Sequence, residues 1–292
     1  MDPASGKRRR RRTLGLLLGC VLLLVLRPPS SGTEVVFLDV GQGDGIWIRS
    51  GSLTVLVDGG STDEKEVGAT VLEPFAKCRG EDKIDYAFVT HADADHISGL
   101  EYLLTGETGI RIGCLVLSAA GQASGQEEYR RLAAEAQARG IPVHWMQAGE
   151  ALAAGDCRLT CLYAGNKEHL TEKNEHSLVL LLETEGRTLL LTGDMTARGE
   201  REMLEQTELS QIDLLKVAHH GSSTATTREL LETIRPAYAV ISCGRKNHYG
   251  HPAPETVRKL EEAGCKIFYT MQEGAGILKI RRGKWFLKGF RS

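Results

Sequence analysis

The chain has 292 residues, of which 41% are hydrophobic and 25% charged, as is typical of a soluble globular protein with one large or two smaller domains. Residues 1–32 carry seven basic side chains and one acidic one, so the net charge of −2 for the whole chain leaves −8 for residues 33–292. An acidic domain argues against non-specific binding of nucleic acid, and seven cysteines without a CxxC pair exclude a cysteine-ligated metal of the usual spacing.

The first 32 residues have the pattern of an export signal. A basic stretch, Lys7 to Arg12, precedes the apolar run Leu14–Leu26, which ends at Arg27-Pro28-Pro29. Thirteen residues are short for a membrane-spanning helix, so a cleaved signal peptide and an uncleaved membrane anchor both stay open. Either one places residues 33–292 outside the cytoplasm, secreted or anchored to the membrane.

Short strands open the remaining chain, and strands and helices then alternate. The predicted strands are Glu34–Val40, Ile46–Ile48, Leu53–Val57, Ile84–Val89, Cys114–Leu117, Val143–Met146, Leu159–Tyr163, Leu178–Glu183, Arg187–Thr192, Asp213–Ala218, Tyr238–Ser242 and Lys266–Tyr269, before a last hairpin about Arg282-Gly283. The predicted helices are Glu66–Lys77, Ser98–Leu104, a helix that a capping box at Ser124–Glu127 opens and Gly140 stops, Arg198–Gln206, Thr226–Ile234 and Pro254–Ala263. This order predicts an α/β (α+β) domain over 33–292, with helices covering sheets.

The densest group of metal-competent side chains follows the strand Ile84–Val89. His91, Asp93, Asp95 and His96 lie within six residues, and alternate positions of an extended segment point the same way. Imidazole nitrogens and carboxylate oxygens are ligands of divalent metals, and four of them so close together need a cation to neutralise them. A polar loop that caps the next helix needs one such residue and not four.

Further candidate ligands also follow strands. Asp194 comes after Arg187–Thr192, His219 and His220 after Asp213–Ala218, and His248 and His251 after Tyr238–Ser242. Because α/β folds gather their sites at strand ends, we expect these residues to meet.

At these positions the sequence resembles the metallo-β-lactamase superfamily, and within it the hydrolase domain of ComEC-type DNA-uptake proteins. The motifs that carry the resemblance are Asp39-Val40-Gly41-Gln42-Gly43-Asp44, Asp58-Gly59-Gly60, His91-Ala92-Asp93-Ala94-Asp95-His96, Asn174-Glu175-His176-Ser177, Thr192-Gly193-Asp194, His219-His220-Gly221-Ser222 and His248-Tyr249-Gly250-His251-Pro252. The resemblance implies a four-layer αββα sandwich. The membrane channel of those uptake proteins is missing from this sequence.

The resemblance also implies a site for two divalent metal ions. His91 and Asp93 would hold the first, Asp95, His96 and either His219 or His220 the second, and Asp194 would bridge them. His220 is favoured because a glycine follows it. Residues expected to brace the ligands or contact substrate are Asp58, Asn174, His176 and Ser222.

Two departures from the superfamily pattern affect the first metal. Asp93 replaces a histidine, and the stretch that usually supplies another histidine reads Asn174-Glu175-His176-Ser177. Both changes make the site richer in oxygen, so Mn²⁺ is a candidate beside Zn²⁺.

The implied reaction is hydrolysis of a phosphodiester, with DNA as the substrate. A metal-bound hydroxide would attack phosphorus, with Asp95 among the catalytic residues, and His248 or His251 would protonate the leaving group or hold the phosphate. Two alternatives stay open: hydrolysis of a small ester, lactone or amide, and a catalytically silent binding module. The sequence identifies no protein partner. A basic patch for DNA, or simply a solvated hairpin, is expected at Lys279, Arg281, Arg282, Lys284, Lys288 and Arg291.

Overall fold

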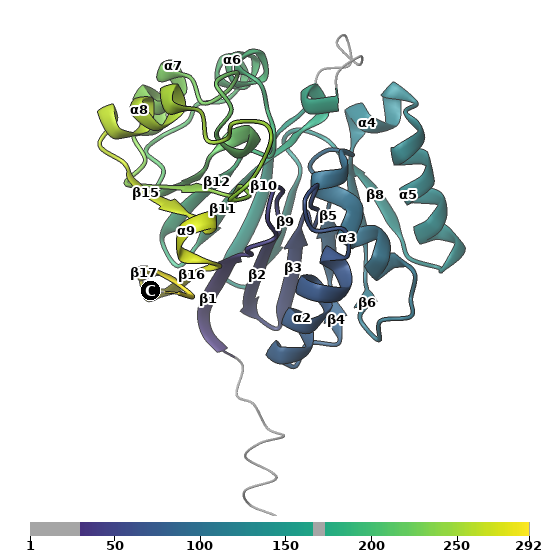
Figure 1. Cartoon of the computed structure of the whole chain (residues 1–292). Helices are drawn as coiled ribbons and strands as arrows, with labels where there is room; N and C mark the ends of the chain where they lie inside the picture. Colours follow the sequence, from purple (N-terminus) through teal and green to yellow (C-terminus); the bar gives the residue numbers. More distant parts are fainter. Residues whose placement is uncertain (1–29, 166–172, 292) are drawn as a thin grey trace, which may run out of the picture. The chain divides into compact units, whose positions relative to one another are not determined.

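A computed structural model describes residues 30–165 and 173–291 of the chain, and Gly32–Ser292 form one compact unit. Within this unit two sheets face each other, and helices cover the outer face of each sheet (Figure 1). This arrangement confirms the predicted αββα sandwich. Of the predicted signal or anchor, residues 1–29 lie outside the described part of the chain, whereas residues 30–32 belong to the first strand, β1 (Ser30–Phe37). Among the described helices, none combines the length and the apolar character that a membrane crossing requires.

The first sheet has its strands in the order β17 (Lys284–Gly289), β16 (Gly276–Arg281), β1 (Ser30–Phe37), β2 (Ile46–Gly51), β3 (Leu53–Val57), β5 (Tyr86–Phe88), β7 (Leu115–Ser118) and β8 (Val143–Met146). The pairs from β3 to β8 are parallel, whereas β17–β16, β16–β1 and β2–β3 are antiparallel. The strand β17 therefore forms one edge of the sheet.

The second sheet runs in the order β15 (Lys266–Tyr269), β14 (Tyr238–Ile241), β13 (Leu214–Lys216), β12 (Arg187–Leu191), β11 (Leu178–Thr184), β10 (Cys157–Ala164) and β9 (Ala151–Ala154). The strands β12 to β15 are parallel, so their carboxyl ends meet at one edge of the sandwich. A tight turn with positive φ at Glu185 and Gly186 joins β11 to β12. A small extra pair, β4 (Lys83–Ile84) and β6 (Arg111–Ile112), lies beside the first sheet.

Three apolar layers pack against the sheets, one on the outer side of each sheet and one between them. The helices α2 (Glu73–Arg79), α3 (Ala94–Leu104) and α5 (Glu127–Ala138) cover the first sheet, and α6 (Ala197–Gln206), α7 (Arg228–Ile234) and α8 (Pro254–Glu262) cover the second. The short helices are η1 (Gly68–Leu72), α4 (Ala119–Ser124), η2 (Lys173–His176), η3 (Ala218–Gly221) and α9 (Thr270–Glu273). Between the sheets, buried aliphatic side chains such as Ile48 and Val57 face Leu180 and Leu191. Burial on both faces explains the continuous apolar runs of the central strands.

Three local predictions are wrong in detail. Ser124 ends α4 instead of opening α5, because Gly125 adopts a left-handed conformation that stops the first helix. The helix expected at Glu66–Lys77 divides into η1 and α2, and the strand expected at Ile84–Val89 divides into β4 and β5, which belong to different sheets. Cys157 and Cys161 are both free thiols of the single strand β10.

Candidate metal centre

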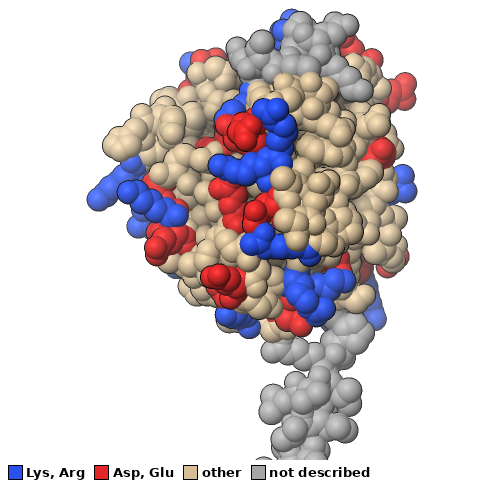
Figure 2. Space-filling model, turned by 90° about the vertical axis from the view of Figure 1, so that its right-hand side faces the viewer, with Lys and Arg blue, Asp and Glu red and all other residues tan. Residues whose placement is uncertain are grey.

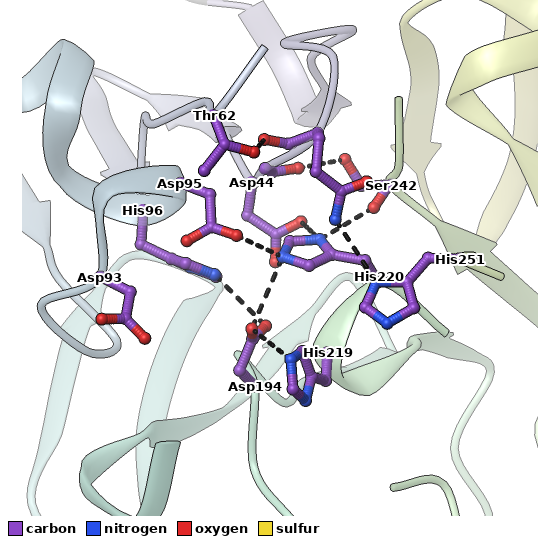
Figure 3. A network of polar contacts seen from close by, with 12 residues as sticks. Asp44, Thr62, Asp93, Asp95, His96, Asp194, His219, His220, Ser242 and His251 are labelled. Atoms are coloured by element: carbon purple, nitrogen blue, oxygen red, sulfur yellow. Dashed lines mark hydrogen bonds and ion pairs between the residues drawn. The ribbon is translucent and has the colours of Figure 1, made fainter. Parts of the chain in front are cut away.

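The loops that follow β5, β12, β13 and β14 bring the predicted ligands together (Figure 3). The segment after β5 carries His91 and Asp93 and continues into the first turn of α3 with Asp95 and His96. The segment after β12 carries Asp194, the short helix η3 after β13 carries His219 and His220, and the loop after β14 carries His251. These residues lie up to 160 positions apart in the chain. Parallel pairing of β12, β13 and β14 accounts for the convergence, because it places the ends of these strands side by side.

A compact cluster forms the centre of the site. One ligand atom from each of Asp95, His96, Asp194 and His220 lies within 4.8 Å of the others. The Nε2 atom of His96 is 3.3 Å from Asp194, and Nε2 of His220 is 3.3 Å from Asp95 and 3.5 Å from Asp194. Asp194 therefore stands between the two imidazoles, as Figure 3 shows.

Hydrogen bonds behind the cluster fix the orientation of both imidazole rings. One carboxylate oxygen of Asp58 lies 2.9 Å from Nδ1 of His96, and the two oxygens also accept the backbone N–H and the hydroxyl of Thr90. The Nδ1–H of His220 donates to the carbonyl of Ser242 at 2.9 Å. Because each ring uses Nδ1 in this way, its Nε2 is directed into the cluster with a lone pair available for a metal. Asp58 thus braces the loop, as the resemblance implies.

The backbone at His219 and His220 is unusual, because both residues adopt φ angles near +50°. Left-handed conformations at two consecutive residues other than glycine are strained. The conformation turns the two side chains apart: His220 is buried, while the His219 side chain is 27% exposed with its Nε2 3.7 Å from Asp194. The strain therefore coincides with the position of the candidate ligands.

His91 and Asp93 lie at the periphery of the cluster. The Nε2 atom of His91 is 3.5 Å from Asp93 and 3.9 Å from Asp194. The other oxygen of Asp93 makes an ion pair of 3.0 Å with the ammonium group of Lys173, which also pairs with Glu128. Asp93 is consequently shared between an imidazole and an ammonium group.

A cavity of about 290 Å³ opens over this cluster. His251 and Tyr249 line it together with Gln42, Thr62 and ligand residues. The Tyr249 ring stacks on His251 with their centroids 5.8 Å apart, and Tyr249 is 61% exposed. Four residues that were expected to contact substrate or brace the ligands are not among the described residues that line the cavity. They are His248, which is exposed, and Asn174, His176 and Ser222.

The orientation of His251 follows from its contact with Gln42. The Gln42 amide oxygen accepts the backbone N–H of Gly244, so its nitrogen is the atom that faces Nδ1 of His251 at 3.4 Å. Accepting this bond at Nδ1 places the ring proton on Nε2. Burial, followed by the neighbouring His220 and His219, lowers the pKa of His251 to about 4. His251 is therefore neutral near pH 7 and can donate one hydrogen bond.

The charged groups of the cluster stabilise one another's ionised forms. Burial opposes ionisation of Asp194, yet His220 and His96 keep the pKa of its carboxyl well below the usual range. Burial likewise opposes the charged form of His96, yet Asp194 and Asp58 raise the pKa of its imidazole well above 6.5. Protons on these rings occupy the positions in which a divalent cation would be bound, so metal binding at this cluster releases protons.

The donor atoms fit a divalent metal ion. Nε2 of His91, His96 and His220 and one oxygen of Asp194 are buried without a hydrogen-bond partner within the described ranges 30–165 and 173–291. Buried atoms of this kind are costly unless a cation pairs with them, and His96, His220 and Asp194 offer ligand atoms that lie within 4.8 Å of one another. Ligands bonded to one ion at about 2.0–2.2 Å lie up to about 4.4 Å apart, close to the spacing found here. The cluster therefore indicates divalent metal binding.

Sequence reasoning missed a buried ion pair behind the cluster. The ammonium group of Lys216 lies 2.6 Å from one oxygen of Asp44, and both side chains are almost fully buried. The second oxygen of Asp44 lies 3.6 Å from Nδ1 of His220. A lysine inside the apolar run Leu214–Ala218 was the available signal, because a buried ammonium group needs a partner.

Comparisons with known sequences agree with this geometry. The sequence model of the metallo-beta-lactamase superfamily matches residues 38–136 and 165–245. The ComE operon protein 3 of Bacillus subtilis is 31% identical over 277 residues, which are 90% of this chain and 35% of that protein. The competence protein ComA of Neisseria gonorrhoeae is 28% identical over 283 residues, 93% of this chain and 37% of that protein. The chain thus spans little more than a third of the length of these relatives.

Solved structures share the fold at low sequence identity. The diiron beta-hydroxylase CmlA of Streptomyces venezuelae superimposes with a TM-score of 0.56 at 15% identity, over 87% of this chain and 55% of CmlA. The metallo-beta-lactamase fold protein YhfI of Bacillus subtilis gives a TM-score of 0.51 at 14% identity, over 88% of this chain and 99% of YhfI. These similarities support the architecture.

Proposed function

The chain belongs to the metallo-beta-lactamase superfamily, and from this premise we propose that it is a metal-dependent phosphodiesterase that cleaves DNA outside the cytoplasm. The superfamily and the His/Asp cluster indicate a metal-dependent hydrolase. The choice of DNA as the substrate is supported by similarity to ComEC-type competence proteins along nine tenths of this chain. Location outside the cytoplasm is supported by the basic and apolar N-terminal sequence.

A single observation carries the hydrolytic part of the proposal. Buried imidazole nitrogens of His96 and His220 and a buried oxygen of Asp194 have no hydrogen-bond partner in the part of the chain that the structure describes. These residues offer ligand atoms within 4.8 Å of one another, and Asp194 and His220 line the cavity. In this proposal Asp95, His96, Asp194 and His220 hold one ion, and His91 with Asp93 contributes to a second, Zn²⁺ or Mn²⁺. Bound divalent ions supply a water of lowered pKa and neutralise charge on a phosphoryl oxygen.

The chain's own residues then orient the substrate. The neutral His251, held by Gln42, donates from Nε2 to a phosphoryl or leaving-group oxygen over the cavity. The exposed ring of Tyr249 offers a flat surface at the cavity mouth on which a base or sugar can pack. Asp95 lies at the cavity wall, 3.3 Å from Nε2 of His220, where its carboxylate can accept a proton as the diester is cleaved.

The test uses the full chain loaded with Mn²⁺ or Zn²⁺ and three substrates: bis-p-nitrophenyl phosphate, single-stranded DNA and nitrocefin. We expect both phosphodiesters to be cleaved and nitrocefin to be spared. The variant Asp194→Asn keeps the shape of the side chain but removes its charge, so bound metal and turnover should fall by about 100-fold or more. Cleavage of nitrocefin alone would favour the small-substrate alternative, and inertness toward all three substrates would favour a binding module.

A further inference from the structure

We infer that the outer face of the hairpin β16–β17 is a docking surface for single-stranded nucleic acid that leads into the metal centre. This inference rests on the proposed function in one respect, because the bound nucleic acid is cleaved only if the metal centre is a phosphodiesterase. The docking surface itself lies in a different part of the molecule. The charge of the hairpin, its aromatic side chains, its open outer face and its contacts toward the cavity support this role.

The charge of this hairpin is opposite to that of the rest of the domain. Residues 279–291 contain six basic side chains and no acidic one, so the net charge of −8 for residues 33–292 leaves −14 for the other residues. The strand register places Lys279 opposite Phe286 and Arg281 opposite Lys284, so these side chains share one face of the sheet. That face presents positive charge to a polyanion.

Exposed aromatic rings alternate with the positive charges. Phe286 is 56% and Phe290 77% exposed, and with Tyr249 at the cavity mouth they are the exposed large hydrophobic residues of the described chain. Residues 284, 286, 288 and 290 have the same parity, so lysine and phenylalanine alternate along one face of an extended segment. Bases stack on such rings while neighbouring cations contact phosphates, which is the common design of single-strand binding surfaces.

The face is open in the structure. Trp285 and Leu287, which point the other way, pack into the apolar layer between the sheets. The helices α2, α3 and α5 cover the outer face further along the first sheet, and β16 and β17 lie away from them (Figure 1). Two aromatic rings left in water are unfavourable for an isolated domain, and a ligand with π faces would cover them.

The opposite end of the first sheet lacks this separation of charge. On the side of the molecule that faces the viewer in Figure 2, where α3 and α5 lie, acidic and basic side chains stand next to each other. Ion pairs join Arg131 to Glu101 and Arg130 to Glu127 there. That face serves as a matched control surface, because Arg130 and Arg131 are both paired. In the described chain Lys279 and Arg291 of the hairpin also have acidic partners, whereas Lys284 and Lys288 have none.

One ion pair joins the end of the hairpin to the segment that leads to the cavity. Arg291, next to Phe290, makes an ion pair of 3.1 Å with Asp39 at the end of the first strand. Asp39 precedes the loop that carries Gln42, and Gln42 lines the cavity beside Tyr249. Phe290 therefore lies next to the segment that leads to Gln42, and in this inference a strand stacked on Phe286 and Phe290 continues from there toward the cavity.

The experiment measures binding of fluorescein-labelled oligothymidylate to the full chain by anisotropy, in EDTA so that no cleavage occurs. We expect tighter binding to the single strand than to a blunt duplex of equal length. The variant F286A/F290A should bind about tenfold more weakly per ring lost, while F286Y/F290Y, which keeps the rings, should bind as the parent does. The variant K284A/K288A should reduce the slope of log K against log salt by about 1.4, because each of the two lost phosphate contacts contributes about 0.7 to that slope.

Controls separate the possible results. R130A/R131A, on the control surface, should leave binding unchanged. Equal affinity of F286A/F290A and parent, or equal affinity for duplex and single strand, would overturn the inference. So would binding to phosphatidylglycerol vesicles without binding to the oligonucleotide, because the patch would then face a membrane. If the metal-loaded parent fails to cleave bis-p-nitrophenyl phosphate while binding in EDTA persists, the proposed hydrolysis fails and the docking surface stands.

Discussion

Two adjacent histidines occupy different positions in the metal centre. His220 is buried, its Nδ1 donates to Ser242, and its Nε2 is 3.3 Å from Asp95. His219 is more exposed, and burial beside His220 lowers the pKa of its imidazole. We expect His220→Ala to lose bound metal by at least about tenfold more than His219→Ala, because only His220 is locked in the tautomer of a ligand. Metal content after dialysis, measured by mass spectrometry, checks this; a larger loss in His219→Ala would reverse the assignment.

His251 makes the stability of the metal-free protein depend on pH. Its pKa is about 4 in the folded protein, against about 6.5 for an ordinary histidine, so between these values the unfolded chain binds more protons. The free energy of unfolding should therefore rise as the pH increases from about 4 to about 6.5. In urea titrations with EDTA at pH 5 and pH 7, His251→Asn should reduce this difference by about 1 kcal/mol, allowing for solvent screening.

A neighbouring histidine provides the control for this pH effect. His248 is exposed and lies in the same loop, so His248→Asn should leave the difference between pH 5 and pH 7 as it is in the parent. If the free energy of unfolding of His251→Asn depends on pH as it does in the parent, a group other than His251 binds the additional proton of the unfolded chain.

At the scale of elements, the sequence predicted most strands and the loops that follow them, because burial on both faces produces apolar runs and the ligands come after these runs. It could not predict that Ile84–Val89 divides between two sheets or that Ser124 ends a helix. These outcomes depend on tertiary pairing, such as that of Lys83 with Arg111, which local patterns do not contain. The burial of Lys216 was visible in the sequence, whereas its partner was not.

The loop after β3 holds the ligand loop through direct backbone contact. A Cβ atom at Gly60 would lie 2.4 Å from the backbone of Ala94, Asp95 and His96. Gly60→Ala must therefore displace the segment that carries two candidate ligands, and we expect metal affinity to fall about 10- to 100-fold. Competition with a chromogenic chelator measures this.

The control for the loop contact is a glycine with open space around it. Gly51 has a φ of +59°, and a Cβ atom added there would meet no other atom within 4 Å. Gly51→Ala should therefore cost about 1 kcal/mol of stability and leave metal affinity unchanged. Equal metal affinity in Gly60→Ala and the parent would show that the ligand loop is held by other contacts, such as those of Asp58.

At the scale of the whole molecule, the metal centre requires the two sheets to stay in a fixed relation. Ligands come from loops of both: Asp95 and His96 follow β5 of the first sheet, whereas Asp194 and His220 follow strands of the second. The ion pair between Asp44 and Lys216 joins the same two halves across 172 residues of sequence. It lies directly behind His220, so it can set the position of the second-sheet ligands against the first sheet.

A double-mutant cycle tests this coupling. Lys216→Met leaves the Asp44 carboxylate buried without its cation, which should destabilise the metal-free protein by about 3–5 kcal/mol in urea titrations. Asp44→Asn leaves the ammonium group of Lys216 unpaired and should also be destabilising. The double variant removes both charges, so it should lose less stability than the two single variants together, by about 2 kcal/mol. Additive losses would mean that the pair does not couple the sheets, and the relation between them would then rest on the apolar layer alone.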